Sequence, residues 1–212
     1  MAIKTILFDC WGTLVENGVA SPIKQVKDIL GITLPFSPYV LRLERSLMTE
    51  KISNLEEGFR RVCQEFGITP TTELLDQLIG TWNKNWMLAQ PYEEVEETLT
   101  QLKKDYQLVL ISNTDNVSIT KILEKLGWEH YFDRIFLSCD VRALKSDRFF
   151  YPTILQELRR TPEECLVVGD SIQSDIIPAK LYQLPVVLMD RRDTRTFSPK
   201  ITNLQELAQH LP

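Results

Sequence analysis

Asp9 and Asp170 each end a short apolar stretch that has the composition of a buried strand, and Asp175 follows Asp170 by five residues. A carboxylate can attack phosphorus or carbon and hold a covalent intermediate, so Asp9 is a candidate nucleophile. Asp170 and Asp175 surround a predicted strand-to-helix turn, and Mg²⁺ prefers such hard oxygen ligands. The alternative is that Asp9 or Asp170 caps a helix. With Asp9 facing them from another strand, the three carboxylates favour a Mg²⁺ site.

Polar residues at further strand ends suit the binding of an anion. Thr13 lies in the predicted tight turn after Asp9, where neighbouring groups can orient a bound molecule. Ser112 and Asn113 end the next predicted strand and can bind phosphoryl or carboxylate oxygens, although both are also common turn formers. Lys145 precedes a predicted helix, and a fixed cation there would neutralise Asp9 and an anionic substrate together. A solvated lysine is the alternative.

Apolar periodicity places these residues on alternating strands and helices. The predicted strands cover residues 3–9, 107–111, 133–138, 165–169 and 185–189, and the predicted helices cover 93–104, 117–126, 149–159, 175–182 and 201–210. The last helix is expected to be capped by Thr202 or Asn203. This rhythm predicts an α/β fold, a Rossmann-like, doubly wound parallel sheet with helices on both faces.

Residues 16–88 interrupt this alternation with apolar residues at three- and four-residue spacing, which is typical of amphipathic helices. Ligands of open parallel sheets bind beyond the carboxyl ends of the strands, where Asp9, Ser112 and Asp170 fall. Since the helical segment leaves the sheet just after Asp9, it would lie over that crevice. We therefore predict a core formed by residues 1–15 and 89–212, with a small α-helical cap formed by residues 16–88.

Composition narrows the classes of protein that fit. The chain has 212 residues, 43% hydrophobic, and a net charge of −5, and its basic and acidic residues alternate, so a nucleic-acid partner is not expected. No stretch approaches the roughly 20 apolar residues of a membrane helix, and no signal peptide is visible. The four scattered cysteines are interpreted as buried reduced thiols. We expect a cytoplasmic protein, monomeric or homodimeric, with a small anionic substrate.

The motifs together resemble the haloacid dehalogenase superfamily over essentially the whole chain, with residues 16–88 in the position of its helical cap. The resemblance is carried by Phe8-Asp9-Cys10-Trp11-Gly12-Thr13-Leu14, Ser112-Asn113, Lys145, and Gly169-Asp170-Ser171 with Asp175. It implies Asp9 as nucleophile, Ser112 with Asn113 as oxyanion-binding element, and Lys145 as charge clamp. It also implies Mg²⁺ held by Asp9, Asp170 and the backbone carbonyl of Trp11, with Asp175 as a further acid at the metal.

Trp11 departs from the pattern of phosphatases in this superfamily, which usually carry an acid/base aspartate two residues after the nucleophile. An indole donates one hydrogen bond but cannot take a proton. The 2-haloacid dehalogenases of the superfamily also have an aromatic residue there, and an arginine on the first cap helices, for which Arg42 and Arg45 are candidates. In contrast, Gly169-Asp170-Ser171 is similar to the metal-binding phosphatases.

Three hypotheses follow. The leading one is a Mg²⁺-dependent phosphatase of a small phosphorylated metabolite that forms an aspartyl-phosphate at Asp9. The second is a dehalogenase-type hydrolase that forms an aspartyl ester. The third is a catalytically weakened binding or regulatory protein, for which Trp82 and Trp86 would form an exposed stripe. The alternative for these two tryptophans, burial in the core of the cap, is the one we favour.

Overall fold

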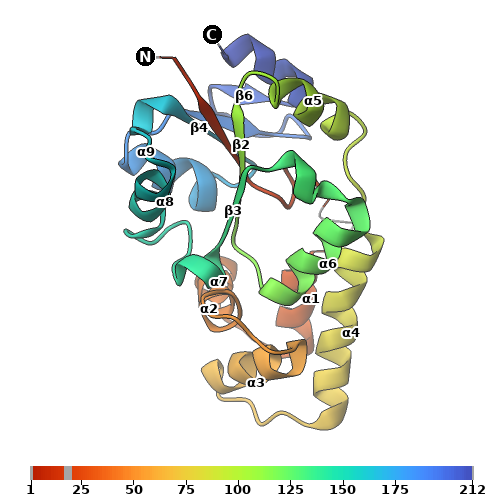
Figure 1. The fold of residues 1–212 in the computed structure, drawn as a ribbon. Helices are drawn as coiled ribbons and strands as arrows, with labels where there is room; N and C mark the ends of the chain where they lie inside the picture. Colours follow the sequence, from red (N-terminus) through yellow and green to blue (C-terminus); the bar gives the residue numbers. More distant parts are fainter. Residues whose placement is uncertain (1, 17–20, 212) are drawn as a thin grey trace.

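The computed structural model describes residues 2–16 and 21–211, and one parallel sheet of six strands forms its centre (Figure 1). The strand order is β3-β2-β1-β4-β5-β6, and every neighbouring pair runs parallel. The strands are β1 (Thr5–Phe8), β2 (Gln107–Ser112), β3 (Arg134–Leu137), β4 (Cys165–Gly169), β5 (Val186–Met189) and β6 (Lys200–Ile201). The predicted α/β fold with a doubly wound sheet is confirmed.

Strand β1 lies in the middle of this sheet and is buried on both faces. Ile6 and Phe8 belong to one hydrophobic cluster, while Leu7 belongs to a second cluster on the opposite face. This follows from the alternation of side chains along a strand, and it explains why the segment is continuously apolar. Phe8 pairs with Leu110 of β2 and with Val168 of β4. The residue after β1 therefore emerges between two neighbouring strand ends.

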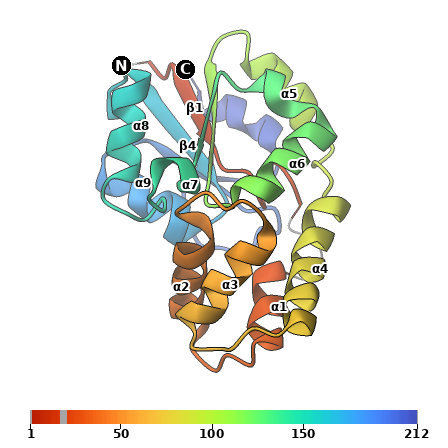
Figure 2. The same ribbon diagram turned by 60° about the horizontal axis from the view of Figure 1, so that its bottom comes forward.

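Helices cover both faces of the sheet (Figures 1 and 2). One face packs against α5 (Val95–Leu102), α6 (Asn116–Leu126) and the C-terminal 3-10 helix Leu204–His210, and the other against α8 (Phe150–Leu158) and α9 (Ile177–Leu181). Short elements complete the connections: the 3-10 turns Trp128–Tyr131 and Pro162–Glu164, helix α7 (Ser138–Val141) and the π-helical turn Ile172–Ile176. In the described residues, no helix combines the length and the apolar composition needed to cross a membrane.

A helical insertion lies between β1 and β2 and projects below the sheet in Figure 1. Its helices are α1 (Pro22–Ile29), α2 (Phe36–Met48), α3 (Leu55–Glu65) and α4 (Thr72–Leu88). They enclose a third hydrophobic cluster, which includes Tyr39, Phe59 and Trp82. Helices α2 and α3 approach closely at Gly58, where an added Cβ would lie 2.5 Å from the Leu47 side chain. The insertion thus has an apolar core of its own. Residues 17–20, which fall in the segment predicted as a cap, lie outside the described residues.

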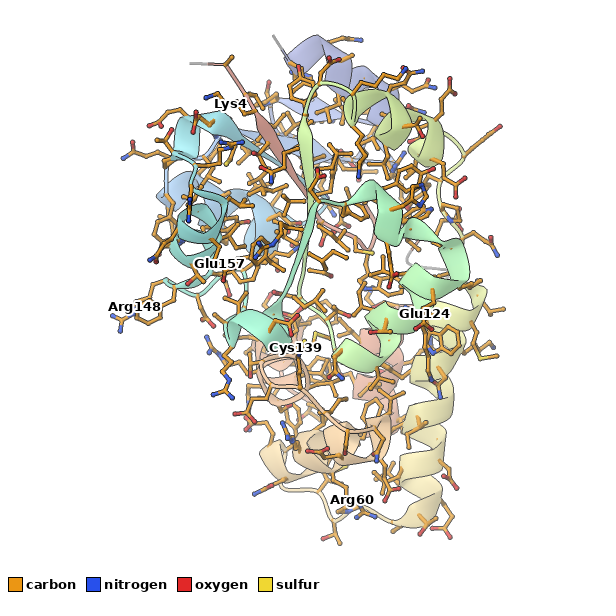
Figure 3. All side chains as sticks on the ribbon, in the orientation of Figure 1. Lys4, Arg60, Glu124, Cys139, Arg148 and Glu157 are labelled. Atoms are coloured by element: carbon orange, nitrogen blue, oxygen red, sulfur yellow. The ribbon has the colours of Figure 1, made fainter. Side chains whose placement is uncertain are left out.

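Hydrogen bonds attach the insertion to the carboxyl edge of the sheet. The indole of Trp82 donates to Asp115 Oδ2 at 2.9 Å, and the Ser138 hydroxyl donates to the Met48 carbonyl at 2.6 Å. Asn116 makes two hydrogen bonds with the backbone of residue 52. In Figure 3, Lys4 marks the amino end of the sheet, Arg60 lies at the far end of the insertion, and Cys139 of α7 lies between them. The insertion therefore covers the edge where ligands of parallel sheets bind.

The predicted helix over residues 201–210 is wrong in its first part. Lys200 and Ile201 form strand β6 beside β5, and a 3-10 helix begins only at Leu204. Asn203 caps that helix, and its backbone N–H and the Glu206 side chain complete a capping box. Two residues are too few to carry the alternation that identifies a strand in a sequence. The predicted helix 175–182 likewise divides into the π-helical turn and α9.

Candidate active site

Asp9 is buried at the carboxyl end of β1, and both of its carboxylate oxygens are bound. Lys145 Nζ lies 2.5 Å from Oδ1, and the Thr13 hydroxyl donates to Oδ2 at 3.1 Å. The turn that brings Thr13 back to Asp9 passes through Gly12, whose φ of 80° is in the left-handed region that favours glycine. The Leu14 and Val15 amides both donate to the Cys10 carbonyl. The turn thus fixes the rotamer of Asp9.

Lys145 is fully buried, and its ammonium bridges two carboxylates. Besides Asp9 it contacts Asp175 Oδ1 at 2.7 Å. Burial alone would lower the pKa of Lys145, but the facing charges of Asp175 and Asp9 raise this pKa above its ordinary value. The lysine therefore stays cationic and presents a fixed positive charge between two acids.

Asp170 and Asp175 reach the same place from the loop after β4. One carboxylate oxygen from each of Asp9, Asp170 and Asp175 lies within 4.8 Å of the others. Asp175 is oriented by the Ser171 amide, which donates to its Oδ2 at 2.9 Å, while the Asp170 carbonyl accepts a hydrogen bond from Arg195. Three hard oxygen donors at this spacing suit a small divalent cation such as Mg²⁺.

Burial and mutual repulsion disfavour the charged forms of two of these acids. Burial raises the pKa of Asp9 to about 6, although the Lys145 charge opposes this, and the charge of Asp175 adds to it. The pKa of Asp170 rises to about 8, chiefly because of burial and then because of the charges of Asp9 and Asp175. A divalent cation among the three oxygens would favour the charged forms, so the electrostatics fit the donor set.

Gly169 is required by the close approach of the acids to β4. A Cβ added there would lie 2.4 Å from Asp175 Cγ. We expect Gly169→Ala to displace the Asp175 carboxylate from Lys145 and to lower turnover by about 10²-fold, since a misplacement of about 1 Å has such effects. Steady-state kinetics measure the turnover, and a thermal melt shows whether the variant is still folded. As a matched change, Gly80→Ala in α4, where a Cβ meets open space, should leave turnover intact. Equal turnover of both variants would contradict the argument.

Trp11 lines the same cavity as Asp9, and its half-buried side chain packs against the core.

Ser112 is fully buried at the end of β2, and its Oγ has no hydrogen-bond partner among the described residues. Ser112 is not among the residues that line the cavity. Its neighbour Asn113 does line it, and the Asn113 Oδ1 accepts the Lys145 amide at 2.9 Å. The Asn113 side chain therefore connects the end of β2 with the loop that carries Lys145.

Glu44 of helix α2 is a site residue that was not predicted from the sequence. Its Oε2 accepts a hydrogen bond from Asn113 Nδ2 at 3.1 Å, and it lines the cavity together with Asp9 and Lys145. Burial raises the pKa of Glu44 to about 7, while the charge of Lys145 opposes this shift. In the sequence, Glu44 is one of several charged residues on an amphipathic helix. Only its four-residue spacing from the apolar Val40 and Met48, which line the same cavity, marks the face it shares.

The cavity between the sheet edge and the insertion has a volume of about 340 Å³. Its floor is polar, while helices α1, α2 and α4 contribute apolar side chains to its walls. These side chains are Ile23, Phe36, Val40, Met48, Trp82 and Trp86. Such a combination suits a small molecule with an anionic group and a partly apolar body.

Arg42 and Arg45 of the insertion lie away from the cavity, whereas Trp82 and Trp86 line it. Arg42 pairs with Glu65 on the surface, and Arg45 pairs with Asp147, so the structure does not bring either guanidinium to the cavity. Trp82 is buried and Trp86 is half-buried against the core, and both line the cavity. The alternative of an exposed tryptophan stripe is therefore wrong.

Together, the parallel sheet, the buried Asp9 carboxylate and its lysine define an α/β protein with a charged site at the carboxyl edge of its sheet. Residues 3–181 match the family model of the haloacid dehalogenase-like hydrolases. The chain belongs to this family and is a hydrolase, and the resemblance inferred from the motifs is confirmed.

Several relatives are named as phosphatases. The chain is 26% identical over 194 residues to a glyceraldehyde 3-phosphate phosphatase of Methanothermobacter thermautotrophicus, an alignment that covers 89% of this chain and 86% of that protein. It is 28% identical over 192 residues to the pyrimidine 5′-nucleotidase PynA of Streptococcus pneumoniae, covering 83% and 79% of the two chains. Hydrolysis of phosphate esters is thus the activity that these relatives' names share.

Solved structures agree in fold. The HAD-hydrolase YfnB from Bacillus subtilis, bound to magnesium, superimposes with a TM-score of 0.70 at 20% identity, covering 100% of this chain and 99% of that one. L-2-haloacid dehalogenase from Xanthobacter autotrophicus, with chloropropionic acid covalently bound, gives a TM-score of 0.65 at 17% identity and covers 98% and 97%. At these identities the likeness establishes the fold and leaves the choice of chemistry to the site.

Proposed function

We propose that this hydrolase is a Mg²⁺-dependent phosphatase of a small phosphorylated metabolite and that it forms an aspartyl-phosphate at Asp9. The observation that carries the proposal is the position of Asp9, held by Lys145 and Thr13 within 4.8 Å of the Asp170 and Asp175 carboxylates. A nucleophilic carboxylate beside a cation-binding cluster suits phosphoryl transfer, where positioning and charge neutralisation supply most of the rate.

Asp9, Asp170 and the backbone carbonyl of Trp11 are the groups that would hold Mg²⁺, with Asp175 as the further acid. Three close carboxylates are in excess over the one ammonium of Lys145 that contacts two of them, so a divalent cation would improve the charge balance. When bound, Mg²⁺ would neutralise charge on the phosphoryl oxygens. These residues define the metal site that we propose.

The other residues of the site would have separate roles in phosphoryl transfer. The Thr13 hydroxyl orients the Asp9 carboxylate, so that one oxygen attacks phosphorus while the bond to the leaving oxygen breaks. Lys145 stabilises the negative charge that Asp9 and the phosphoryl group bring together. Of the two residues expected to bind a phosphoryl oxygen, Asn113 lines the cavity and would do so, whereas the Ser112 hydroxyl is buried outside its lining. Helices α1–α4 would serve as a cap that excludes water.

A carbon–halogen hydrolase is less well supported by the same site. Trp11 suits that chemistry because a halide leaves without a proton. However, Arg42 and Arg45, the candidates for a halide-binding arginine, pair with Glu65 and Asp147 away from the cavity. Three clustered carboxylates also serve no evident purpose in a metal-free displacement. The phosphatase therefore remains the function that we propose.

Phosphate release from acetyl phosphate and from 4-nitrophenyl phosphate tests the proposal, since both have good leaving groups and depend least on an acid. We expect turnover with Mg²⁺ and its loss when a chelator is added, restored by excess Mg²⁺. Halide release from 2-chloropropionate is measured in parallel. Turnover that is unaffected by the chelator, or halide release without phosphate release, would contradict the proposal.

A further inference from the structure

Glu44 enters the cavity from the insertion, whereas Asp9 enters it from the end of a strand of the sheet. It lies on α2, whose residues Val40 and Met48 line the same cavity one turn to either side. A leaving group attached to phosphorus points away from the attacking carboxylate, because attack and departure are in line. The insertion is therefore the part of the molecule that a leaving group would meet.

The Glu44 carboxyl is held in place by a fixed hydrogen-bond chain. Asn113 Oδ1 accepts the Lys145 backbone amide at 2.9 Å, which turns its Nδ2 toward Glu44 Oε2 at 3.1 Å. Lys145 in turn contacts Asp9 at 2.5 Å. Glu44 thus has a defined position relative to the nucleophile, although it comes from a different layer of the structure.

No cation neutralises this carboxyl. Within residues 2–16 and 21–211, Glu44 forms no ion pair, and Asn113 supplies its hydrogen bond. The two arginines that flank Glu44 on α2 are paired elsewhere, because Arg42 pairs with Glu65 and Arg45 pairs with Asp147. The groups whose charges reach Glu44 are Lys145, Asp175 and Asp9, and burial outweighs them, so its pKa rises to about 7. A carboxyl of this kind can both give and take a proton near neutral pH.

We infer that Glu44 is the general acid and base of this hydrolase and takes the part that the side chain of Trp11 cannot perform. The inference rests on the proposed phosphatase function and names the residue that lets the site accept esters with poor leaving groups. It is carried by the shared cavity, the hydrogen bond to Asn113 and the absence of an ion pair at Glu44 in the described structure. Because the indole of Trp11 cannot act as an acid or base, another group must protonate the leaving oxygen.

The proton balance runs through both half-reactions. As an Asp9 oxygen bonds to phosphorus, the bond between phosphorus and the ester oxygen breaks, and its electron pair on that oxygen takes the proton of Glu44. The alcohol leaves, and Glu44 remains as a carboxylate. Glu44 then takes a proton from water as the water oxygen bonds to phosphorus. The bond from phosphorus to Asp9 breaks, its electron pair returns to Asp9, and Glu44 is protonated again.

Glu44→Gln tests the inference through its dependence on the leaving group. Glutamine keeps the size of the side chain and an oxygen that can accept from Asn113, but it carries no proton to give. We expect kcat/KM for glycerol 2-phosphate to fall by about 10²–10⁴-fold, and kcat/KM for 4-nitrophenyl phosphate to change little, because nitrophenolate leaves unprotonated. With 4-nitrophenyl phosphate, kcat should fall and a burst of nitrophenolate should appear, because water attack on the aspartyl-phosphate has lost its base.

The matched control is Glu65→Gln, an exposed glutamate outside the cavity that pairs with Arg42. It should leave both substrates unaffected. Equal losses on the two esters in Glu44→Gln would assign Glu44 a structural role through Asn113 and overturn the inference, as would no loss on either. If the unmodified protein turns over neither ester with Mg²⁺, the proposed function fails first, and the inference falls with it.

Discussion

Asp9→Asn is expected to abolish turnover of every phosphate ester, with a loss of about 10⁴-fold or more, as when a covalent nucleophile is removed from other hydrolases. The amide keeps the shape of the side chain but has lost the charge and nucleophilicity of the carboxylate. Lys145 can still contact the amide oxygen and Asp175, and Thr13 stays in reach, so the fold should persist. Phosphate release, measured at equal concentrations of folded variant and folded unmodified protein, gives the size of the loss.

Asp76→Asn provides the matched control, because Asp76 is an exposed aspartate on α4. Its substitution should leave both phosphate release and thermal stability unaltered. Residual turnover in Asp9→Asn within about tenfold of the unmodified protein would show that another group attacks phosphorus. A tenfold loss corresponds to only about 1.4 kcal/mol of activation free energy, far less than the loss of a nucleophile.

Lys145→Met is expected to damage stability as well as activity. The methionine fills most of the space, but it leaves Asp9 and Asp175 buried, close together and without their shared cation. Removing one partner of a buried ion pair commonly costs about 3–5 kcal/mol. Chemical denaturation in the presence of a chelator should show a loss of this order. Because the remaining carboxylates would still bind a divalent cation, added Mg²⁺ should restore part of the stability but little of the activity.

Lys51→Met is the comparison for this variant, because Lys51 forms an exposed ion pair with Asp140. Solvent screens exposed pairs and they contribute little to stability, so the free energy of unfolding should hardly change. A similar stability for Lys145→Met and Lys51→Met would mean that the contacts of Lys145 with Asp9 and Asp175 do not stabilise the fold.

Much of the framework can be predicted from the sequence, because it depends on local patterns. Continuous apolar runs identified β1 and β4 as buried strands, and the residues that end them are necessarily at one edge of a parallel sheet. The fold class thus placed Asp9 and Asp170 on the same edge, and the pairing of β1 with β4 brings them close together. Asp175 could be predicted at the same edge because it lies about one turn into the helical segment after Asp170. The structure places it against Lys145.

What could not be predicted depends on contacts between distant segments. Glu44 lies 69 residues from Asn113, and only its spacing from Val40 and Met48 separates it from the other charged residues of α2. Arg42 and Arg45 had the right residue type for an anion site, but Glu65 and Asp147 bind them elsewhere. A helix face can be read from periodicity, whereas the partner that each face meets depends on how the insertion docks on the sheet.

Transfer of a phosphoryl group to Asp9 can be observed by peptide mass spectrometry of acid-quenched protein. The protein is mixed briefly with acetyl phosphate and Mg²⁺, quenched, and digested. We expect a phosphoryl group on the peptide that contains Asp9, absent when a chelator is present and absent in Asp9→Asn. Phosphate release with no phosphoryl group on that peptide at any quench time, or with the group on another residue, would rule out Asp9 as the nucleophile.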